Sequence, residues 1–266
     1  ANHLMAKSRY EYVKSFEVIE SQLPNTYMVV RLDGRCFHKF TQEHNYQKPN
    51  DERALKLMSK CAFRCMEEFP ECCFAYGESD EYSFVMRPDA KVFSRRKDKI
   101  TTTFASLFSS SFVFYWKEFF GDVPLQYAPI FDGRMVIYPT FRILRDYLSW
   151  RQVDCHINNL YNTSFWMLVL RGGLSTKEAE ELLRGTTSED KNEILFSQFQ
   201  LNYNNEPEMF KKGTTIYRGF VEVQHVDRRT GETRSKQKKK LKITHEDIIS
   251  DSFWKEHPEA IPDNTK

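Results

Sequence analysis

Two adjacent carboxylates, Asp80 and Glu81, lie between two apolar segments that have the composition of buried strands. An earlier strand-like segment ends in a further acid, Asp33, which is followed by Gly34. Carboxylates are ligands that Mg²⁺ prefers, and glycine lets a backbone carbonyl approach an ion closely. Two such ions clamp the attacking and leaving oxygens of a phosphoryl or nucleotidyl transfer. The alternative is that both acidic sites are solvated turns.

A second Asp-Gly-Arg tripeptide, at Asp132, Gly133 and Arg134, shows how weak this pattern is on its own. It precedes a strand-like segment and has no acidic pair as a partner, so we assign it to a turn. Clustered acids have raised pKa values unless a cation lies among them. The combination of Asp33 with Asp80 therefore favours a metal site more than either acid alone does, without excluding the turns.

The first half of the chain alternates strand-like and helix-like segments. The patterns predict a strand at 26–35, a helix at 49–69 capped by Asn50 or Asp51, a hairpin at 72–86, a long helix at 91–120 and a strand at 133–139. This β-α-β-β-α-β order is the ferredoxin-like layout of polymerase and cyclase palm domains, an α+β fold with helices on one face of an antiparallel sheet. Because its first and third strands are central neighbours, we expect the acids to converge at one edge.

The second half is richer in helix and ends in a predicted β-hairpin. Helical patterns cover 144–170, 175–185 and 187–199, with a capping box at Ser175 and Glu178, and strand patterns cover 213–226 and 239–249. The connecting basic loop, Arg228–Lys242, is either a contact for nucleic-acid phosphates or a solvated arm. We expect a palm-like catalytic domain over 6–139 and a helical portion with the hairpin over 140–266. No Gly/Ser- or Pro-rich linker separates them, so we expect one packed body.

Composition narrows the class of protein without naming a partner. The 266 residues have a formal net charge of +2, and 15% of them are aromatic, which is typical of neither a disordered chain nor a coiled coil. The six cysteines include no CxxC pair, so we interpret them as reduced thiols in an intracellular protein. No apolar run approaches the length of a membrane span, and no secretory signal is visible. We expect a cytoplasmic or nuclear location, with a mitochondrial role also open.

Six blocks of sequence occur in order over nearly the whole chain: RLDGRCFHKF, QKPND, YGESDEYSF, YLSWRQVDCHINNLYN, DKNEILF and NYNNE. Together they resemble the tRNA-His guanylyltransferase family of 3′-5′ nucleotidyltransferases. The resemblance implies addition of a guanosine to the 5′ end of tRNA-His, at position −1. It implies that ATP adenylylates the tRNA 5′-monophosphate, that the GTP 3′-hydroxyl displaces AMP, and that pyrophosphate is then removed. It further implies two Mg²⁺ ions, contacts with the acceptor end and the anticodon, and a homotetramer built as a dimer of dimers.

The resemblance also assigns roles to individual residues. Asp33, Gly34 and Asp80 resemble the family's metal ligands, and Asp33, Asp80 and Glu81 its catalytic acids. The residues that resemble the nucleotide-binding positions are Arg31, Arg35, Cys36, Phe37, His38, Lys48, Asp51, Ser79, Arg96 and Lys99. Those that resemble the tRNA-binding positions are His156, Asn159, Tyr161, Asn162, Lys191 and Asn202.

Structural roles compete with several of these assignments. Asp51 is as well suited to cap a helix as to accept the guanine N1 and N2 protons. His38 alone would equally be a packed side chain, and Arg96 with Lys99 would equally be a solvated helix face. Three functions compete with the guanylyltransferase: a template-dependent 3′-5′ tRNA-repair polymerase without strict tRNA-His choice, a nucleotide cyclase and a non-catalytic tRNA-binding protein.

Overall fold

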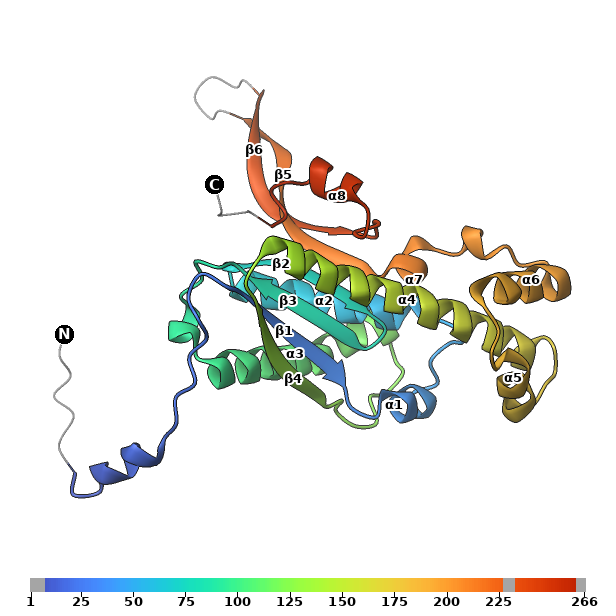
Figure 1. Cartoon of the computed structure of the whole chain (residues 1–266), viewed down its shortest axis with the longest axis horizontal. Helices are drawn as coiled ribbons and strands as arrows, with labels where there is room; N and C mark the ends of the chain where they lie inside the picture. Colours follow the sequence, from blue (N-terminus) through green and yellow to red (C-terminus); the bar gives the residue numbers. More distant parts are fainter. Residues whose placement is uncertain (1–7, 227–232, 262–266) are drawn as a thin grey trace.

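The computed structural model describes residues 8–226 and 233–261. In this part of the chain one antiparallel sheet has the strand order β4-β1-β3-β2-β5-β6 (Figure 1). The strands are β1 (Tyr27–Gly34), β2 (Cys72–Glu78), β3 (Glu81–Met86), β4 (Phe131–Tyr138), β5 (Thr214–Val226) and β6 (Thr233–Thr244). The α-helices are α1 (Phe37–Glu43), α2 (Glu52–Glu68), α3 (Lys97–Phe120), α4 (Phe141–Leu170), α5 (Thr176–Leu183), α6 (Ser188–Phe199), α7 (Glu208–Lys212) and α8 (Asp251–Glu256). Short 3₁₀ turns are η1 (Glu11–Phe16), η2 (Val92–Arg95) and η3 (Tyr203–Asn205).

One face of the sheet packs against α2 and α3. Met28, Val30 and Leu32 alternate along β1 and are fully buried in the same cluster as the apolar side chains of these two helices. Each such side chain stabilises the fold by about 1.5–3 kcal/mol relative to exposure. The α2 helix begins where the sequence predicts, because the Asp51 carboxylate accepts a hydrogen bond from the Arg53 backbone N–H.

The opposite face of the sheet is covered by α4 and α8 from the second half of the chain. Tyr27 and Val29, the alternate residues of β1, pack there with Leu144 and Leu148 of α4 and Trp254 of α8. The expectation of helices on one face therefore holds for α2 and α3 but not for the whole molecule. This second layer positions α4 directly against the strands that contain the acids.

The second half joins the first through the sheet. β5 pairs with β2 over Phe74–Gly77, so the six strands are continuous across the two halves. The helical pattern predicted over 144–170 belongs to the single 30-residue helix α4, which extends past the sheet towards α5 and α6 (Figure 1). The predicted capping box is confirmed, because Ser175 and Glu178 cap α5 reciprocally. The boundary between 6–139 and 140–266 stays a prediction.

Three expectations from local sequence are wrong. Asp132 and Gly133 lie inside β4 rather than in a turn, because the whole of β4 pairs with β1. Residues 233–238 of the predicted basic loop belong to β6, which continues into the predicted strand and ends at Thr244, and residues 228–232 of that loop lie outside the described residues. The long helix begins at Lys97, after the 3₁₀ turn Val92–Arg95, rather than at 91.

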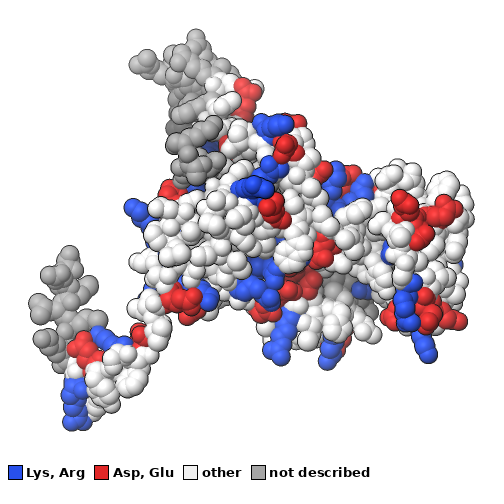
Figure 2. Space-filling view, in the orientation of Figure 1, with Lys and Arg blue, Asp and Glu red and all other residues white. Residues whose placement is uncertain are grey.

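Charge of both signs is present on the face that Figure 2 shows, in line with the small net charge of the chain. Figure 2 shows basic and acidic side chains interspersed over the coloured part of one face. Of the helices described, none has both the length and the apolar character needed to cross a membrane.

Candidate functional site

A row of four carboxylates crosses the sheet at the end of β1. Asp33 is directly opposite Asp132 on β4 and Glu81 on β3, and Glu81 is directly opposite Glu78 on β2. Residues opposite each other in antiparallel strands project to the same face. The row therefore lies on the face that α4 covers. The sequence placed Asp33, Glu81 and Asp132 near strand ends, but it did not predict that four carboxylates lie side by side across the sheet.

Asp80 lies in the turn between β2 and β3, beside the end of β1. Its backbone carbonyl accepts a hydrogen bond from the Gly34 N–H at 3.1 Å, and Ser79 Oγ donates to its Oδ1 at 2.9 Å. A Cβ on Gly34 would lie 2.8 Å from Asp80 Oδ2, so only glycine leaves room for this carboxylate. Burial raises the pKa of Asp80, and the negative charge of Asp33 raises it further. The two carboxylates that the sequence predicted to converge are therefore close enough to repel each other.

The groups at this edge fit a hard divalent cation. The carboxylates of Asp33 and Asp80 and the backbone carbonyl of Gly34 are all oxygen donors, which suits Mg²⁺ better than a softer metal. The two carboxylates share a partly buried position, where a cation would relieve their mutual repulsion. These observations support the residues chosen from the sequence, while their roles as ligands stay a prediction.

Glu81 is paired with a different partner, Arg151 of α4, which also lies near Glu78. Arg151 Nη1 donates to both carboxylate oxygens of Glu81 at 3.2 and 3.0 Å and lies 3.8 Å from Glu78 Oε1. Arg31 Nε lies 3.6 Å from Glu81, and Arg151 Nη2 donates to Asp154 at 3.1 Å. Burial, together with the charges of Glu81 and Asp154, raises the pKa of Glu78 to about 8. Glu81 is therefore bound to two guanidinium groups instead of being directed at Asp80.

The acidic edge opens into a cleft of about 750 Å³ between the sheet, residues 36–55, α4 and residues 209–214. Many of the residues selected from the sequence line it. These are Asp33, Gly34, Cys36, Phe37, His38, Lys48, Asp51, Ser79, Asp80, Glu81, Asn159, Tyr161 and Asn162. Segments far apart in the sequence thus meet in one cavity, large enough for a nucleotide and part of a second substrate.

The remaining selected residues lie outside this cleft within one subunit. They are Arg31, Arg35, Arg96, Lys99, His156, Lys191 and Asn202. Arg96 precedes α3 and forms an isolated β-bridge with Ser21. The neighbouring Arg95 side chain donates a hydrogen bond to the Thr26 carbonyl, immediately before β1. This is the end of β1 opposite Asp33.

Three of the selected side chains make bonds that stabilise local structure. Lys191 donates to the carbonyls of Thr186 and Thr187 at the start of α6. Asn202 accepts from the Asn204 N–H. Asp51 accepts from the Gln47 N–H and from the Arg53 side chain besides capping α2. Its carboxylate is thus occupied, which favours the cap over guanine recognition.

Several lining residues were not selected from the sequence. They are Tyr46, Asn50, Glu78, Arg151, Asp154, Asn158, Phe165 and Trp166. For some of them helical spacing is the one signal in the sequence that could have found them. Asn158, Asn162 and Trp166 are spaced four residues apart and therefore share a face of α4. Arg151 gave no local signal, because its role depends on strands distant in sequence.

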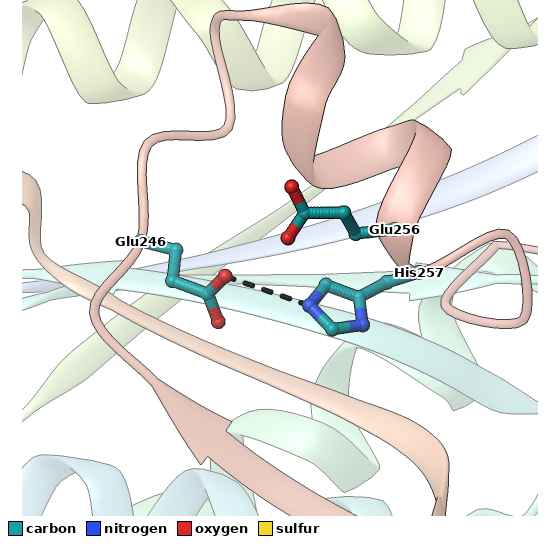
Figure 3. Close-up of side chains that lie close together, drawn as sticks. All are labelled: Glu246, Glu256 and His257. Atoms are coloured by element: carbon teal, nitrogen blue, oxygen red, sulfur yellow. Dashed lines mark ion pairs between the residues drawn. The ribbon is translucent and has the colours of Figure 1, made fainter.

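A separate cluster lies beside α8. Glu246, Glu256 and His257 have potential ligand atoms within 4.8 Å of one another, and His257 Nε2 lies 3.5 Å from Glu246 (Figure 3). The His257 ring also packs against Tyr217 and Phe253. These contacts join the segment after β6 to the end of α8, and none of the three residues lines the cleft.

An α+β fold with carboxylate and carbonyl oxygens at the mouth of a large cleft is consistent with nucleotidyl transfer. Comparison with known proteins identifies the class of protein. The family model described as tRNAHis guanylyltransferase matches residues 10–139, and the Thg1 C-terminal domain matches residues 142–252. The chain therefore belongs to the tRNA-His guanylyltransferase family of nucleotidyltransferases.

Individual relatives agree with this membership. A probable tRNA(His) guanylyltransferase of Mus musculus is 53% identical over 97% of this chain and 89% of its own length. The tRNA(His) guanylyltransferase of Schizosaccharomyces pombe is 51% identical over 96% of this chain and 97% of its own. The crystal structure of the Saccharomyces cerevisiae enzyme matches with a TM-score of 0.76 and 49% identity, over 79% of this chain and 93% of that one. A bacterial Thg1-like protein in complex with ATP shares the fold, with a TM-score of 0.70 and 21% identity over 94% of this chain and 95% of that one.

Proposed function

We propose that the edge formed by Asp33, Gly34 and Asp80 is where this tRNA-His guanylyltransferase transfers nucleotides. The enzyme adds a guanosine to the 5′ end of tRNA-His, at position −1. The observation that supports this location is the close approach of Asp80 to Gly34, which leaves two partly buried carboxylates and a carbonyl at the mouth of the cleft. The sheet order β4-β1-β3-β2, with α2 and α3 on one face, supports a palm-type catalytic domain.

Asp33, Asp80 and the Gly34 carbonyl would hold two Mg²⁺ ions. When bound, these ions would lower the pKa of an attacking hydroxyl and neutralise a triphosphate. Ser79 fixes the Asp80 carboxylate through its hydrogen bond, and Arg151 holds Glu81 away from it. GTP and ATP are the proposed nucleotides, and the complexes of the bacterial Thg1-like protein with ATP and with GTP support this.

His38 and Lys48 are the basic residues from the selected set that line the cleft, and we assign them to phosphate groups of the nucleotide. Burial lowers the pKa of Lys48, so its ammonium gains from a phosphate partner that restores a counter-charge. The three chemical steps, adenylylation of the tRNA 5′-monophosphate, attack by the GTP 3′-hydroxyl and removal of pyrophosphate, would share this edge.

The tRNA would reach the same cleft along α4. Asn159, Tyr161 and Asn162 line it, and amide and aromatic side chains suit unpaired bases. His156, Lys191 and Asn202 lie outside the cleft, and we keep for them the homotetramer that the family resemblance implies, in which different subunits hold the acceptor end and the anticodon. Arg96 and Lys99, selected for the nucleotide, also lie outside the cleft. A cytoplasmic or nuclear location stays an expectation.

Asp80→Asn tests the location of the transfer, with Asp132→Asn as its matched control. Both variants remove one charge near Asp33, but Asp132 is half exposed, pairs with Arg134 and does not line the cleft. We expect Asp80→Asn to abolish GMP addition to 5′-monophosphorylated tRNA-His while the tRNA still binds. Asp132→Asn should act within a few-fold of wild type.

Equal losses of activity in the two variants would show that the negative charge near Asp33 matters and not a ligand at Asp80. Full activity of Asp80→Asn would place the transfer elsewhere. Adding GMP equally well to a tRNA with another anticodon would favour a repair polymerase without strict tRNA-His choice.

A further inference from the structure

The positive charge of the chain is concentrated in its last two strands. Residues 214–226 and 233–244, which form β5 and β6, contain seven Lys or Arg and one Glu, a net charge of +6. Because the 266 residues together have a net charge of +2, the 241 residues outside these two strands carry −4. Clustered cations on a chain that is otherwise acidic are typical of a surface that attracts a polyanion.

Part of these strands forms a two-stranded ribbon that extends away from the rest of the sheet (Figure 1). β2 pairs with β5 only as far as Tyr217, whereas β5 and β6 stay paired with each other up to Val226 and Thr233. A two-stranded ribbon on its own buries little apolar surface. Its side chains are therefore more available for binding than those of the central strands.

The basic residues of β6 recur at every second position. They are Arg234, Lys236, Lys238, Lys240 and Lys242, here called the basic row. Successive residues of a strand alternate between its faces, so these five positions lie on one face. The residues opposite them on β5 are His225, Val223, Val221, Gly219 and Tyr217, so the paired positions of this face include no acid. Tyr217 packs against Phe253 of α8, and the basic row therefore lies on the α8 side of the sheet.

The exposed lysines of the basic row have no acidic partner. No carboxylate in the described part of the chain forms an ion pair with Lys238 or Lys240. Arg218 of β5, by contrast, is used within the fold, because it donates hydrogen bonds to the carbonyls of Phe69 and Cys72. Neighbouring positions of the basic row are about 6.7 Å apart, and two unit charges at that distance repel by about 0.6 kcal/mol in water. An anion bound along the basic row would relieve this repulsion.

We propose that the basic row binds phosphate groups of the tRNA outside the catalytic cleft. From Arg234 to Lys242 the basic row rises over eight residue steps, about 27 Å, which matches several successive phosphates and exceeds the length of one triphosphate. None of its residues lines the cleft, so the incoming nucleotide is not its ligand. This inference rests on tRNA being the substrate, as the family membership shows, and not on where the transfer takes place.

Protection of the sheet edge is the competing explanation for the basic row. β6 is the last strand of the sheet, and charged side chains on an edge strand keep other chains from pairing with it. A charge of either sign serves that purpose, whereas phosphates require cations. Charge reversal separates the two roles, because glutamate at the same positions still protects the edge but repels tRNA.

The experiment compares two neighbouring residues of the same strand. Lys240→Glu reverses a charge of the basic row. Lys239→Glu is the matched control, because Lys239 is also exposed but lies on the opposite face, across from Phe220. Lys238→Glu/Lys240→Glu reverses two charges of the basic row, and Lys240→Arg keeps the charge. Binding of tRNA-His is titrated without GTP or ATP at salt concentrations from about 0.05 to about 0.4 M, so that no transfer takes place.

The expected losses follow from the release of counterions. Each phosphate contact contributes about 0.7–0.9 to the slope of log K against log salt, which is about fivefold in Kd at about 0.15 M salt. We expect Lys240→Glu to weaken tRNA binding at least about fivefold and to lower the slope by about one. The double variant should bind about 25-fold more weakly, with a slope lower by about two. Lys239→Glu and Lys240→Arg should bind as wild type, and no variant should change the KM for GTP.

Three results would overturn the proposal. A loss of binding in Lys239→Glu as large as that in Lys240→Glu would show that only the total charge matters. Wild-type binding by Lys238→Glu/Lys240→Glu, with the protein still monomeric or in its wild-type assembly, would assign the basic row to edge protection. Weaker binding without a change in the salt slope would place the loss in folding. Full activity of Asp80→Asn would contradict the proposed location of the transfer and leave this inference standing.

Discussion

Gly34→Ala should disable the acidic edge through a single methyl group. The new Cβ would meet Phe37 Cδ2 more closely than any other atom, and it would lie 2.8 Å from Asp80 Oδ2 and 2.9 Å from Phe37 Cγ. Carbon atoms pack best at about 3.5–4.0 Å, so the Phe37 ring must move although it is buried against Phe40, Phe112 and Phe131. The carboxylate of Asp80 must shift as well, by about half to one ångström.

Gly133→Ala is the matched control from the second Asp-Gly-Arg copy. Its Cβ would lie 2.8 Å from Thr101 Cγ2 and 3.1 Å from Leu32 Cδ2, on the face of the sheet away from the acids. Overpacking of this kind costs about 1–3 kcal/mol, so both variants should lose similar amounts of free energy of unfolding. A displacement of about 1 Å at the reacting groups costs about 100-fold in rate. Only Gly34→Ala should show this additional loss of reaction rate.

The assay is single-turnover addition of GMP to 5′-monophosphorylated tRNA-His, at a temperature where urea unfolding shows each variant to be folded. We expect a rate about 100-fold lower for Gly34→Ala and within about threefold of wild type for Gly133→Ala. Equal rates for the two variants would refute the argument that the space above Gly34 positions Asp80.

Two further substitutions test the groups around the cleft. Arg151→Met should lower the free energy of unfolding by about 3–5 kcal/mol, because buried Glu81 loses its hydrogen-bonded guanidinium and keeps only Arg31, whose Nε lies 3.6 Å away. Adding Glu81→Gln should recover part of this loss, and a double-mutant cycle in urea that shows no coupling would contradict it. Asp51→Asn should cost about 1–2 kcal/mol at neutral pH. Although burial acts to raise it, hydrogen bonds from Arg53 and Gln47 lower the pKa of Asp51. Wild type should therefore have a larger free energy of unfolding than Asp51→Asn above the usual aspartate pKa, and this difference should disappear as the pH falls below it. A difference in the free energy of unfolding that stays constant from neutral to acid pH would refute this.

Local signals in the sequence were sufficient where the structure is itself local. The helix that Asp51 caps, the capping box at Ser175 and the hairpin around Asp80 all follow from spacing and turn chemistry within a few residues. The convergence of Asp33 and Asp80 followed from the strand order, because β1 and β3 are neighbours in the sheet.

The errors arose where a distant partner decides the conformation. Asp132 has the neighbours of a turn residue, yet pairing with β1 holds it in a strand. Residues 233–238 have the composition of a solvated arm, yet pairing with β5 places them in a strand. Arg151 was indistinguishable from a surface arginine on a helix until the sheet placed Glu81 beneath it. These are long-range pairings that no window of sequence contains.

The pairing of β5 with β2 has a consequence for the order of synthesis. The ribosome completes β1 to β4 about 75 residues before it begins β5, and during that interval β2 is an open edge of a hydrophobic sheet. Such an edge is a template for strands of other chains. A nascent or prematurely terminated chain should therefore need a chaperone until its own late strand covers that edge.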